Sequence, residues 1–156
     1  MWKYKELELN KIEDFPEGTY GFIYLITHTP TGKKYIGKKV LYFNRAKKLT
    51  KKEIQILKEE RKSKGIGGRI PTKRRVIKES DWKTYYGSNR EIQTMIKEGK
   101  SEEFSREVLL FVTSKKLLTY YETKYLFKYE VLENENYFNR DILGKFHVRD
   151  FEKVED

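Results

Sequence analysis

Two tyrosines, Tyr24 and Tyr35, are residue types that could take part in proton chemistry. Each lies in a short segment that reads as a β-strand, and the residues between them, 27–32, contain a proline and a glycine that favour a turn. A hairpin would bring the two phenols close together, where their hydroxyl groups could hold or transfer protons. Most tyrosine pairs in hairpins, however, are only packed aromatic rings. The pair alone therefore leaves a catalytic and a structural role open.

A carboxylate in an unusual place is the second candidate. Glu122 lies four residues after Leu118 and four before Leu126, within a helical pattern that begins at Ser114. It should therefore lie on the apolar face of its helix, where an ionised carboxylate is costly unless it is paired or binds a metal ion. A metal ligand and a carboxylate hydrogen-bonded to a neighbouring tyrosine both fit this position.

The order of these residue types resembles the GIY-YIG endonuclease superfamily, and in particular the free-standing homing endonucleases of phages. Arg45 follows Tyr35 by ten residues, similar to the family's spacing to its helix arginine, and residues 82–89 also resemble phage members. Two positions depart from the family pattern: Phe22 replaces its glycine, and Leu49 stands where many relatives have a histidine. The matching residues span 20–140 and are, in order, Tyr24, Tyr35-Ile36-Gly37, Arg45, Glu122 and Asn139.

The resemblance implies a metal and an arginine in the site. Glu122 would bind one divalent cation, Mg²⁺ or Mn²⁺, because Mg²⁺ keeps several waters and binds through few carboxylates. Arg45 would hold the scissile phosphate by charge-assisted hydrogen bonds. Residues 45–81 look like an insertion relative to minimal family domains, so Arg69, Arg74 or Arg75 could fold back and replace Arg45.

The resemblance also implies that Tyr24 is the general base or part of its relay, with Tyr35 hydrogen-bonded beside it. The reference pKa of a phenol is about 10, and moving it to about 7 means stabilising the phenolate by roughly 4 kcal/mol. Nearby cations can do this, and the candidates are Lys38, Lys39 and the metal. We favour Lys39, because alternation along the strand puts it on the same face as Tyr35.

Other residues would support the site. A side chain at Gly37 would crowd the phosphate or the tyrosine pair. Asn139 either fixes the terminal loop against the site or is an ordinary turn residue. Ser88 and Asn89 could contact phosphate, although a capping role at the start of a helix is sufficient for Ser88.

Positive charge is concentrated in one segment. Between Lys38 and Lys78 there are 16 Lys/Arg and three Glu, a net charge of +13, whereas the rest of the chain carries −3. The position of this segment directly after the second tyrosine favours binding to nucleic acid over a merely solvated lysine-rich surface. Besides Ser88 and Asn89, the residues predicted to bind DNA are Lys38, Lys47, Lys48, Arg69, Lys73, Arg74 and Arg75.

The apolar patterns predict an α+β fold, with a small three-stranded antiparallel sheet flanked by helices. Strands are expected at 20–27, 33–40 and 106–112, and helices at 50–62, at 88–99 and from 114 onward. Residues 1–18 read as a polar lead-in and those beyond 145 as a charged tail. We expect a single domain over 1–156, with its core at 19–140 and a basic helix and loop insertion at 45–81.

Composition argues against several classes of protein. The chain has no cysteine, so it has no disulfides and no thiolate metal site, and its two histidines nearly exclude a site built from histidines. No apolar run approaches about 18 residues, and the N-terminus lacks the apolar core of a signal peptide. We therefore expect a cytoplasmic protein, in the host cytoplasm if a phage encodes it, without a membrane partner.

The sequence thus favours a metal-dependent DNA endonuclease that resembles homing enzymes. A restriction-type or structure-specific nuclease on the same domain is one alternative, and a non-catalytic nucleic-acid-binding module is another. Because only a short segment follows residue 140, recognition of DNA is expected to rest on the basic insertion, the lead-in or a partner. The target and the oligomeric state, monomer or dimer, stay open at this point.

Overall fold

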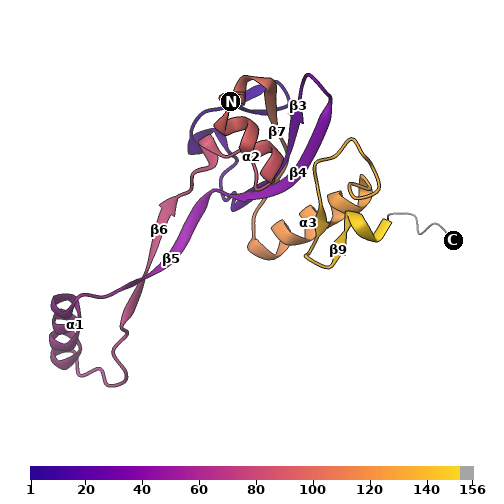
Figure 1. Ribbon diagram of the computed structural model, residues 1–156. Coiled ribbons are helices and arrows are strands. Elements are labelled where there is room, and N and C mark those ends of the chain that lie inside the picture. Colours follow the sequence, from indigo (N-terminus) through magenta and orange to yellow (C-terminus); the bar gives the residue numbers. More distant parts are fainter. Residues whose placement is uncertain (152–156) are drawn as a thin grey trace. The chain divides into compact units, whose positions relative to one another are not determined.

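The structure is a computed structural model that describes residues 1–151, so the last residues of the charged tail, 152–156, lie outside the described part. Its contacts divide it into two compact units. The first unit comprises residues 1–41 and the chain from residue 81 onward, and the second comprises residues 42–80. The two units are described one at a time (Figure 1).

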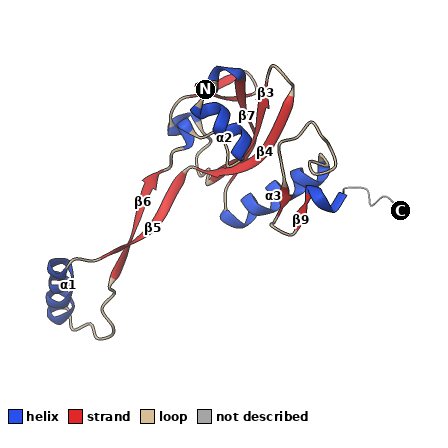
Figure 2. Cartoon of the chain, viewed as in Figure 1, coloured by secondary structure: helices blue, strands red, loops and turns tan. Residues whose placement is uncertain are grey.

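The first unit contains a five-stranded sheet, two α-helices and a short hairpin (Figure 2). Its helices are α2 (Arg90–Lys97) and α3 (Lys115–Lys128). Its strands are β1 (Trp2–Tyr4), β2 (Leu7–Leu9), β3 (Gly21–His28), β4 (Lys33–Val40), β7 (Phe104–Val112), β8 (Asp141–Ile142) and β9 (Phe146–His147). Short 3₁₀ helices cover Ile12–Asp14, Trp82–Thr84, Ser101–Glu103 and Val148–Phe151.

The five strands have the order β2-β1-β7-β3-β4. β3 pairs antiparallel with β4 on one side and with β7 on the other, so the three predicted strands and the α+β class are confirmed. The prediction of a three-stranded antiparallel sheet is wrong in its extent, because residues 1–18 add β2 and also β1, which runs parallel to β7. Trp2 ties this segment down: its side chain is buried, and its indole Nε1 donates a hydrogen bond to the Trp82 carbonyl at 2.6 Å.

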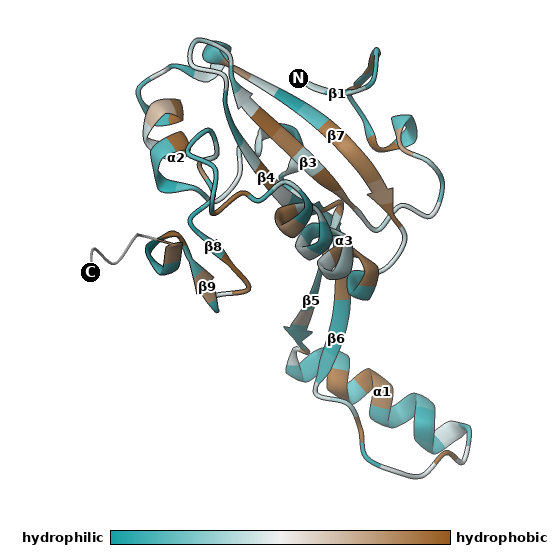
Figure 3. Ribbon diagram, turned by 90° about the vertical axis from the view of Figure 1, so that its right-hand side faces the viewer, coloured by the Kyte–Doolittle hydropathy of each residue, from teal (hydrophilic) through white to brown (hydrophobic). Residues whose placement is uncertain are grey.

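Strand β3, which lies between β7 and β4, is apolar on both faces, as its sequence predicted. Tyr24 and its neighbours two residues away join a core on one face that includes Ile92 of α2. Ile23 joins the core on the other face, which includes Leu118 and Leu126 of α3. Figure 3 shows the hydrophobic stretches of β3 and β7 in the middle of the sheet, and α3 contacts both β3 and β4.

The outer edge of β4 is covered by the chain around residues 136–139. The backbone N–H of Lys34 donates to the Asn136 carbonyl at 2.8 Å, and the Phe138 N–H donates to the Lys34 carbonyl at 2.7 Å. Two residues further along β4, the Asn139 side chain takes the place of a neighbouring strand. Its Oδ1 accepts from the Ile36 N–H at 3.1 Å, and its Nδ2 donates to the Ile36 carbonyl at 2.8 Å. An exposed edge strand would otherwise offer these groups to another chain.

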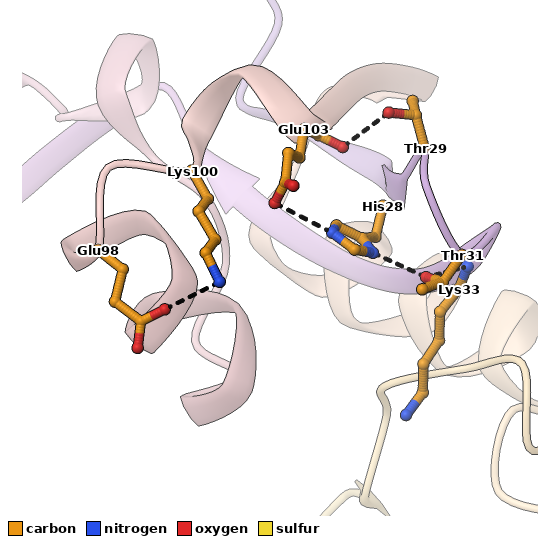
Figure 4. A network of polar contacts seen from close by, with 7 residues as sticks. All are labelled: His28, Thr29, Thr31, Lys33, Glu98, Lys100 and Glu103. Atoms are coloured by element: carbon orange, nitrogen blue, oxygen red, sulfur yellow. Dashed lines mark hydrogen bonds and ion pairs between the residues drawn. The ribbon is translucent and has the colours of Figure 1, made fainter.

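The turn between β3 and β4 is held in place by contacts of His28, as Figure 4 shows. One ring nitrogen of His28 lies 2.7 Å from the Thr31 hydroxyl, and the other lies 3.4 Å from the carboxylate of Glu103. Thr29 adds a hydrogen bond from its hydroxyl to the Glu103 carbonyl at 2.9 Å. These contacts place His28 in a structural role at the turn.

The helices begin close to their predicted residues, with one correction. Ser114 caps α3, because its side chain accepts a hydrogen bond from the Leu117 N–H. The predicted cap of α2 was Ser88, but Asn89 occupies that position and accepts from the Ile92 N–H at 3.1 Å. Asparagine and serine are equally good at this position, so the sequence could not decide between two adjacent candidates.

The second unit is a two-stranded antiparallel ribbon that carries a helix. Its strands are β5 (Tyr42–Lys48) and β6 (Lys73–Glu79), and between them lies α1 (Lys51–Ser63). The predicted helix at 50–62 is confirmed, and Thr50 caps it. The flanking segments were expected to be loop, but they pair along seven residues each. Neither strand alternates between buried and exposed side chains, so the usual sequence pattern of a strand is missing.

Among residues 1–151, no helix is both long enough and apolar enough to cross a membrane.

Candidate active site

The two tyrosines meet where β3 and β4 pair. Tyr24 is opposite Gly37 in the register of the two strands, and its phenol extends across Gly37. A methyl group added at Gly37 would overlap the Tyr24 hydroxyl. The Tyr35 ring lies beside it, with 6.2 Å between the ring centroids. The glycine therefore leaves the space through which the Tyr24 hydroxyl reaches the outer strand of the sheet.

Residues 85–88 contact both phenols. The Tyr35 hydroxyl lies 3.0 Å from the Ser88 hydroxyl, and the Tyr24 hydroxyl hydrogen-bonds to that of Tyr85. Gly87, which has a positive φ of 84°, lets this segment pass close to both tyrosines. Because Asn89 caps α2, the Ser88 hydroxyl is available for Tyr35. Tyr85 was not among the predicted site residues, and only its place in the segment 82–89 hinted at a role.

The pKa values of the phenols move opposite to the expected direction. Burial, followed by the neighbouring Tyr85 and Tyr35, raises the pKa of the Tyr24 phenol well above its ordinary value. Burial also raises the pKa of Tyr35, although the hydrogen bond with Ser88 acts the other way. The expectation of a phenol brought to a pKa near neutrality by a lysine is therefore wrong for the protein alone. At neutral pH both hydroxyls keep their protons.

Lys39 lies on the tyrosine face of β4, as strand alternation predicted, but its charge has other contacts. Its Nζ binds the Asp81 carboxylate at 2.5 Å and lies 4.0 Å from the centroid of the Tyr85 ring. The hydrogen bond from Lys39 lowers the pKa of Asp81. Lys39 thus contacts the tyrosine that is hydrogen-bonded to Tyr24.

Glu122 reaches the same stretch of β4 from the opposite face of the sheet. It occupies the apolar stripe of α3 between the buried Leu118 and Leu126, yet 20 % of its side chain stays exposed. Lys38 is its nearest cation, with 3.9 Å between Nζ and Oε1, and the same Nζ donates to the Thr119 hydroxyl at 3.0 Å. The glutamate therefore lies beside the residue that follows Gly37.

Burial is the main influence on this carboxylate and raises the pKa of Glu122. The charge of Lys38 and a hydrogen bond from its backbone N–H act in the opposite direction, whereas Asp141 adds to the rise. Asp141 also raises the pKa of Tyr35. A carboxylate that burial disfavours, with part of its surface still open, gains from binding a cation.

The residues of the site fit a divalent ion held by few protein ligands. Within residues 1–151, no group of three or more His, Asp or Glu side chains lies together as a metal site. A site of that kind is what zinc requires, whereas Mg²⁺ commonly binds through one or two carboxylates together with substrate phosphates and water. Glu122, with Asp141 near it, matches the second pattern.

A cavity of about 330 Å³ opens next to Tyr35 and contains two arginines that sequence reasoning missed. Its lining residues are Tyr35, Ser88, Asn89, Arg90, Glu91, Arg140 and Asp141. Arg90 is the first residue of α2, and Arg140 directly follows the asparagine that seals β4. Both signals were present in the sequence, as an arginine after a helix cap and an arginine after the family asparagine.

The predicted arginine, Arg45, belongs to the second unit. Arg45 is on strand β5 of the second unit rather than on a helix, and its guanidinium lies 4.9 Å from the Phe43 ring centroid. Its three alternatives, Arg69, Arg74 and Arg75, belong to the same unit, as do Lys47, Lys48 and Lys73. The first unit by itself brings together Tyr24, Tyr35, Gly37, Lys38, Lys39, Ser88, Asn89, Glu122 and Asn139.

A comparison with protein families agrees with the fold and the tyrosine hairpin. Residues 2–142 match the family model described as "Putative endonuclease segE, GIY-YIG domain". The chain therefore belongs to the GIY-YIG family, whose members are nucleases that hydrolyse phosphodiester bonds. Searches of the curated proteins and of the solved structures found no match to the chain.

We predict that Gly37→Ala destabilises the protein and impairs cleavage. The added methyl group would overlap the Tyr24 phenol, and overpacking of this kind costs about 1–3 kcal/mol of unfolding free energy. Urea denaturation and a nicking assay would measure the two effects. Gly67→Ala is the matched control, because its methyl group would meet nothing within 4 Å. Wild-type stability and activity in Gly37→Ala would contradict the described packing.

Proposed function

We propose that the chain is a metal-dependent DNA endonuclease of the homing type. The observation that carries this proposal is the convergence on one strand, β4, of the tyrosine pair from one face and of Glu122 from the other. Phosphodiester hydrolysis needs an activated water, positive charge near the phosphoryl oxygens and a proton for the leaving oxygen. The first unit offers residues for the first two of these needs.

Glu122 would hold the single divalent cation, Mg²⁺ or Mn²⁺, with Asp141 adding negative charge nearby. The bound cation would stabilise negative charge on the phosphate as the reaction proceeds. Lys38 contacts the carboxylate at 3.9 Å and so opposes the effect of burial on the pKa of Glu122. A divalent cation at Glu122 would take over this stabilisation of the carboxylate charge.

Tyr24 would act as a relay rather than as a phenolate. Its raised pKa keeps the proton on the hydroxyl, and this hydroxyl is hydrogen-bonded to that of Tyr85. A relay would accept a proton from the attacking water while it passes its own proton to Tyr85, and Tyr85 would release its proton to solvent. Tyr35, held by Ser88, would fix the position of the water or of the phosphate. Lys39, whose Nζ lies 4.0 Å from the centroid of the Tyr85 ring, would stabilise the negative charge that develops on Tyr85 as this proton leaves.

Arg90 and Arg140 would bind the scissile phosphate in place of Arg45. They line the cavity that Tyr35 also lines, so a phosphate in this cavity would lie beside the tyrosine. Guanidinium groups bind phosphate oxygens through paired hydrogen bonds. The rest of the DNA contacts predicted for the chain, at Lys38, Ser88 and Asn89 and at the basic residues of the second unit, would position the duplex.

The arginines can be separated by substitution. Single-turnover cleavage with saturating protein should fall by about 10²-fold in the double variant Arg90→Gln/Arg140→Gln, the typical loss of a group that stabilises charge in the transition state. Arg45→Gln should cleave at nearly the wild-type rate once DNA is saturated. The opposite ranking of the two variants would return the catalytic role to Arg45.

The function itself is tested on genomic DNA. Purified protein is incubated with phage and bacterial DNA and Mg²⁺, and the new ends are sequenced. One long asymmetric site would support a homing-type enzyme, whereas short palindromes or branched junctions would favour the restriction-type or structure-specific alternative. Absence of any cut, with equal binding by Glu122→Gln, would leave the non-catalytic binding module.

Glu122→Gln should abolish cleavage and also stabilise the metal-free protein. Burial raises the pKa of Glu122, so the charged form is held at a cost in the folded state. This cost is present above the folded-state pKa and disappears as the pH falls below the unfolded value of about 4.3. Amide replacement should therefore raise Tm by about 2–4 °C at pH 7, if it recovers on the order of 1 kcal/mol.

The Tm difference between Glu122→Gln and the wild-type protein should shrink as the pH approaches 4. Differential scanning calorimetry in EDTA from pH 4 to 8 measures it. A variant that cleaves as fast as wild type, or that is less stable at pH 7, would remove Glu122 from its proposed role.

A further inference from the structure

The net positive charge of the protein lies entirely in the second unit. Residues 42–80 contain 14 Lys/Arg and four Glu, a net charge of +10. The remaining residues contain 20 Lys/Arg and 20 Asp/Glu, so their formal charge is zero. The electrostatic attraction to DNA, which dominates non-specific affinity, therefore resides in the unit that lacks the tyrosine hairpin and Glu122.

The ribbon of this unit has no core of its own. Every side chain of β5 and β6 is exposed except Phe43, which is partly buried. Within residues 42–80 only Leu49 and Ser80 are buried. An isolated two-stranded hairpin is marginally stable in water, so a ribbon exposed on both faces gains from a partner that covers it.

The two faces of the ribbon differ in charge. Paired residues of neighbouring strands point to the same face, and successive residues alternate. One face therefore carries Arg45, Lys47, Arg74 and Lys78 without any acidic residue, and we call these four the cationic face. Between them lie the apolar Phe43 and Val76. The opposite face carries Lys48, Lys73 and Arg75 together with Glu79, a net charge of +2 against +4, and also the strongly exposed Ile77.

Contacts within the unit keep the cationic face oriented. The Arg45 guanidinium lies 4.9 Å from the centroid of the Phe43 ring, which confirms that the two residues share a face. Arg74 Nε lies 3.8 Å from the Glu53 carboxylate of α1, at the end of the ribbon near the helix. Both arginine side chains remain mostly exposed.

We propose that the ribbon inserts its cationic face into the major groove of duplex DNA and supplies most of the binding affinity, a proposal that rests on the DNA endonuclease function above. Seven residue pairs span about 23 Å, and two strands lie about 4.8 Å apart. The major groove of B-form DNA is about 12 Å wide and admits a two-stranded ribbon. The deep, narrow major groove of duplex RNA does not.

The test compares two variants that each lose four positive charges from the same unit. Arg45→Gln/Lys47→Gln/Arg74→Gln/Lys78→Gln removes the cationic face, and Lys51→Gln/Lys52→Gln/Lys58→Gln/Lys62→Gln removes four exposed cations of α1. Both are made in the Glu122→Gln background and measured without metal, by fluorescence anisotropy on duplex DNA over a range of salt. Circular dichroism and Tm establish that both variants are folded.

The ribbon variant should bind duplex DNA at least roughly tenfold more weakly than the helix variant. Its slope of log affinity against log salt should be smaller in magnitude than that of the Glu122→Gln parent by about three to four. Methyl green, a major-groove ligand, should displace the Glu122→Gln parent protein, whereas netropsin, a minor-groove ligand, should not. Equal losses in the two variants, or displacement by netropsin alone, would overturn the proposal.

The outcome is independent of catalysis, because binding is measured in a variant that does not cleave. If wild-type protein binds duplex DNA through the ribbon but never cuts it, the endonuclease function fails and the groove contact stands. If wild-type protein cuts DNA and the ribbon variant binds as tightly as its parent, the groove contact fails and the function stands.

Discussion

Strand β4 makes hydrogen bonds on both of its edges, and the arrangement of the site depends on this. Its inner edge pairs with β3 and thereby places Tyr24 opposite Gly37. Its outer edge is taken by the chain around residues 136–139, through the Asn139 side chain and its neighbours, and by the Glu122 carboxylate at the Lys38 N–H. The same bonds that seal the edge bring Arg140 and Asp141 next to the tyrosines. A buried backbone group without a partner is costly, so the contacts that satisfy this edge also stabilise the arrangement of the site.

The sequence predicts those parts of the fold whose side chains alternate or repeat. β3, β4, β7, α2 and α3 follow apolar patterns, whereas α1 has no buried residue and begins at the cap residue Thr50; all six appear close to the expected residues. β1 and β2 were missed because three-residue strands are too short to alternate, and a single tryptophan anchors them. β5 and β6 were missed because neither of their faces is buried. An alternating sequence pattern arises when one face of a strand is buried. β5 and β6 are recognised only by their backbone pairing.

The site shows the same division. Glu122 was found because a carboxylate on an apolar stripe contradicts the pattern around it. The choice of Arg45 rested on spacing along the chain, and the structure places that arginine on β5 of the second unit. Arg90 and Arg140 became visible only when the chain closed a cavity around Tyr35. The pKa of Tyr24 likewise depends on burial, which the sequence indicates only in part. The raised pKa favours the relay over the general base, the two roles that the sequence left open.

The two units also divide the physical work that DNA cleavage requires. The first unit is formally neutral and holds the tyrosine pair and the partly buried carboxylate, whereas the net positive charge lies in the ribbon and its helix. Of the four lysines of β4, the two that follow Gly37 each have a carboxylate as a partner: Lys38 contacts Glu122, and Lys39 contacts Asp81. The charges of these two lysines are thus balanced before any DNA arrives.

The central claim is that the Tyr24 hydroxyl passes a proton in the cleavage step, and Tyr24→Phe tests it most directly. Single-turnover cleavage by this variant should fall by about 10²–10⁴-fold, the usual contribution of a positioned proton-transfer group, while the ring stays packed against Trp2 and Phe22. Tyr20→Phe, on a half-buried tyrosine of the opposite core, should leave the rate unchanged. A Tyr24→Phe protein that is folded, binds DNA and cleaves at the wild-type rate would contradict the account.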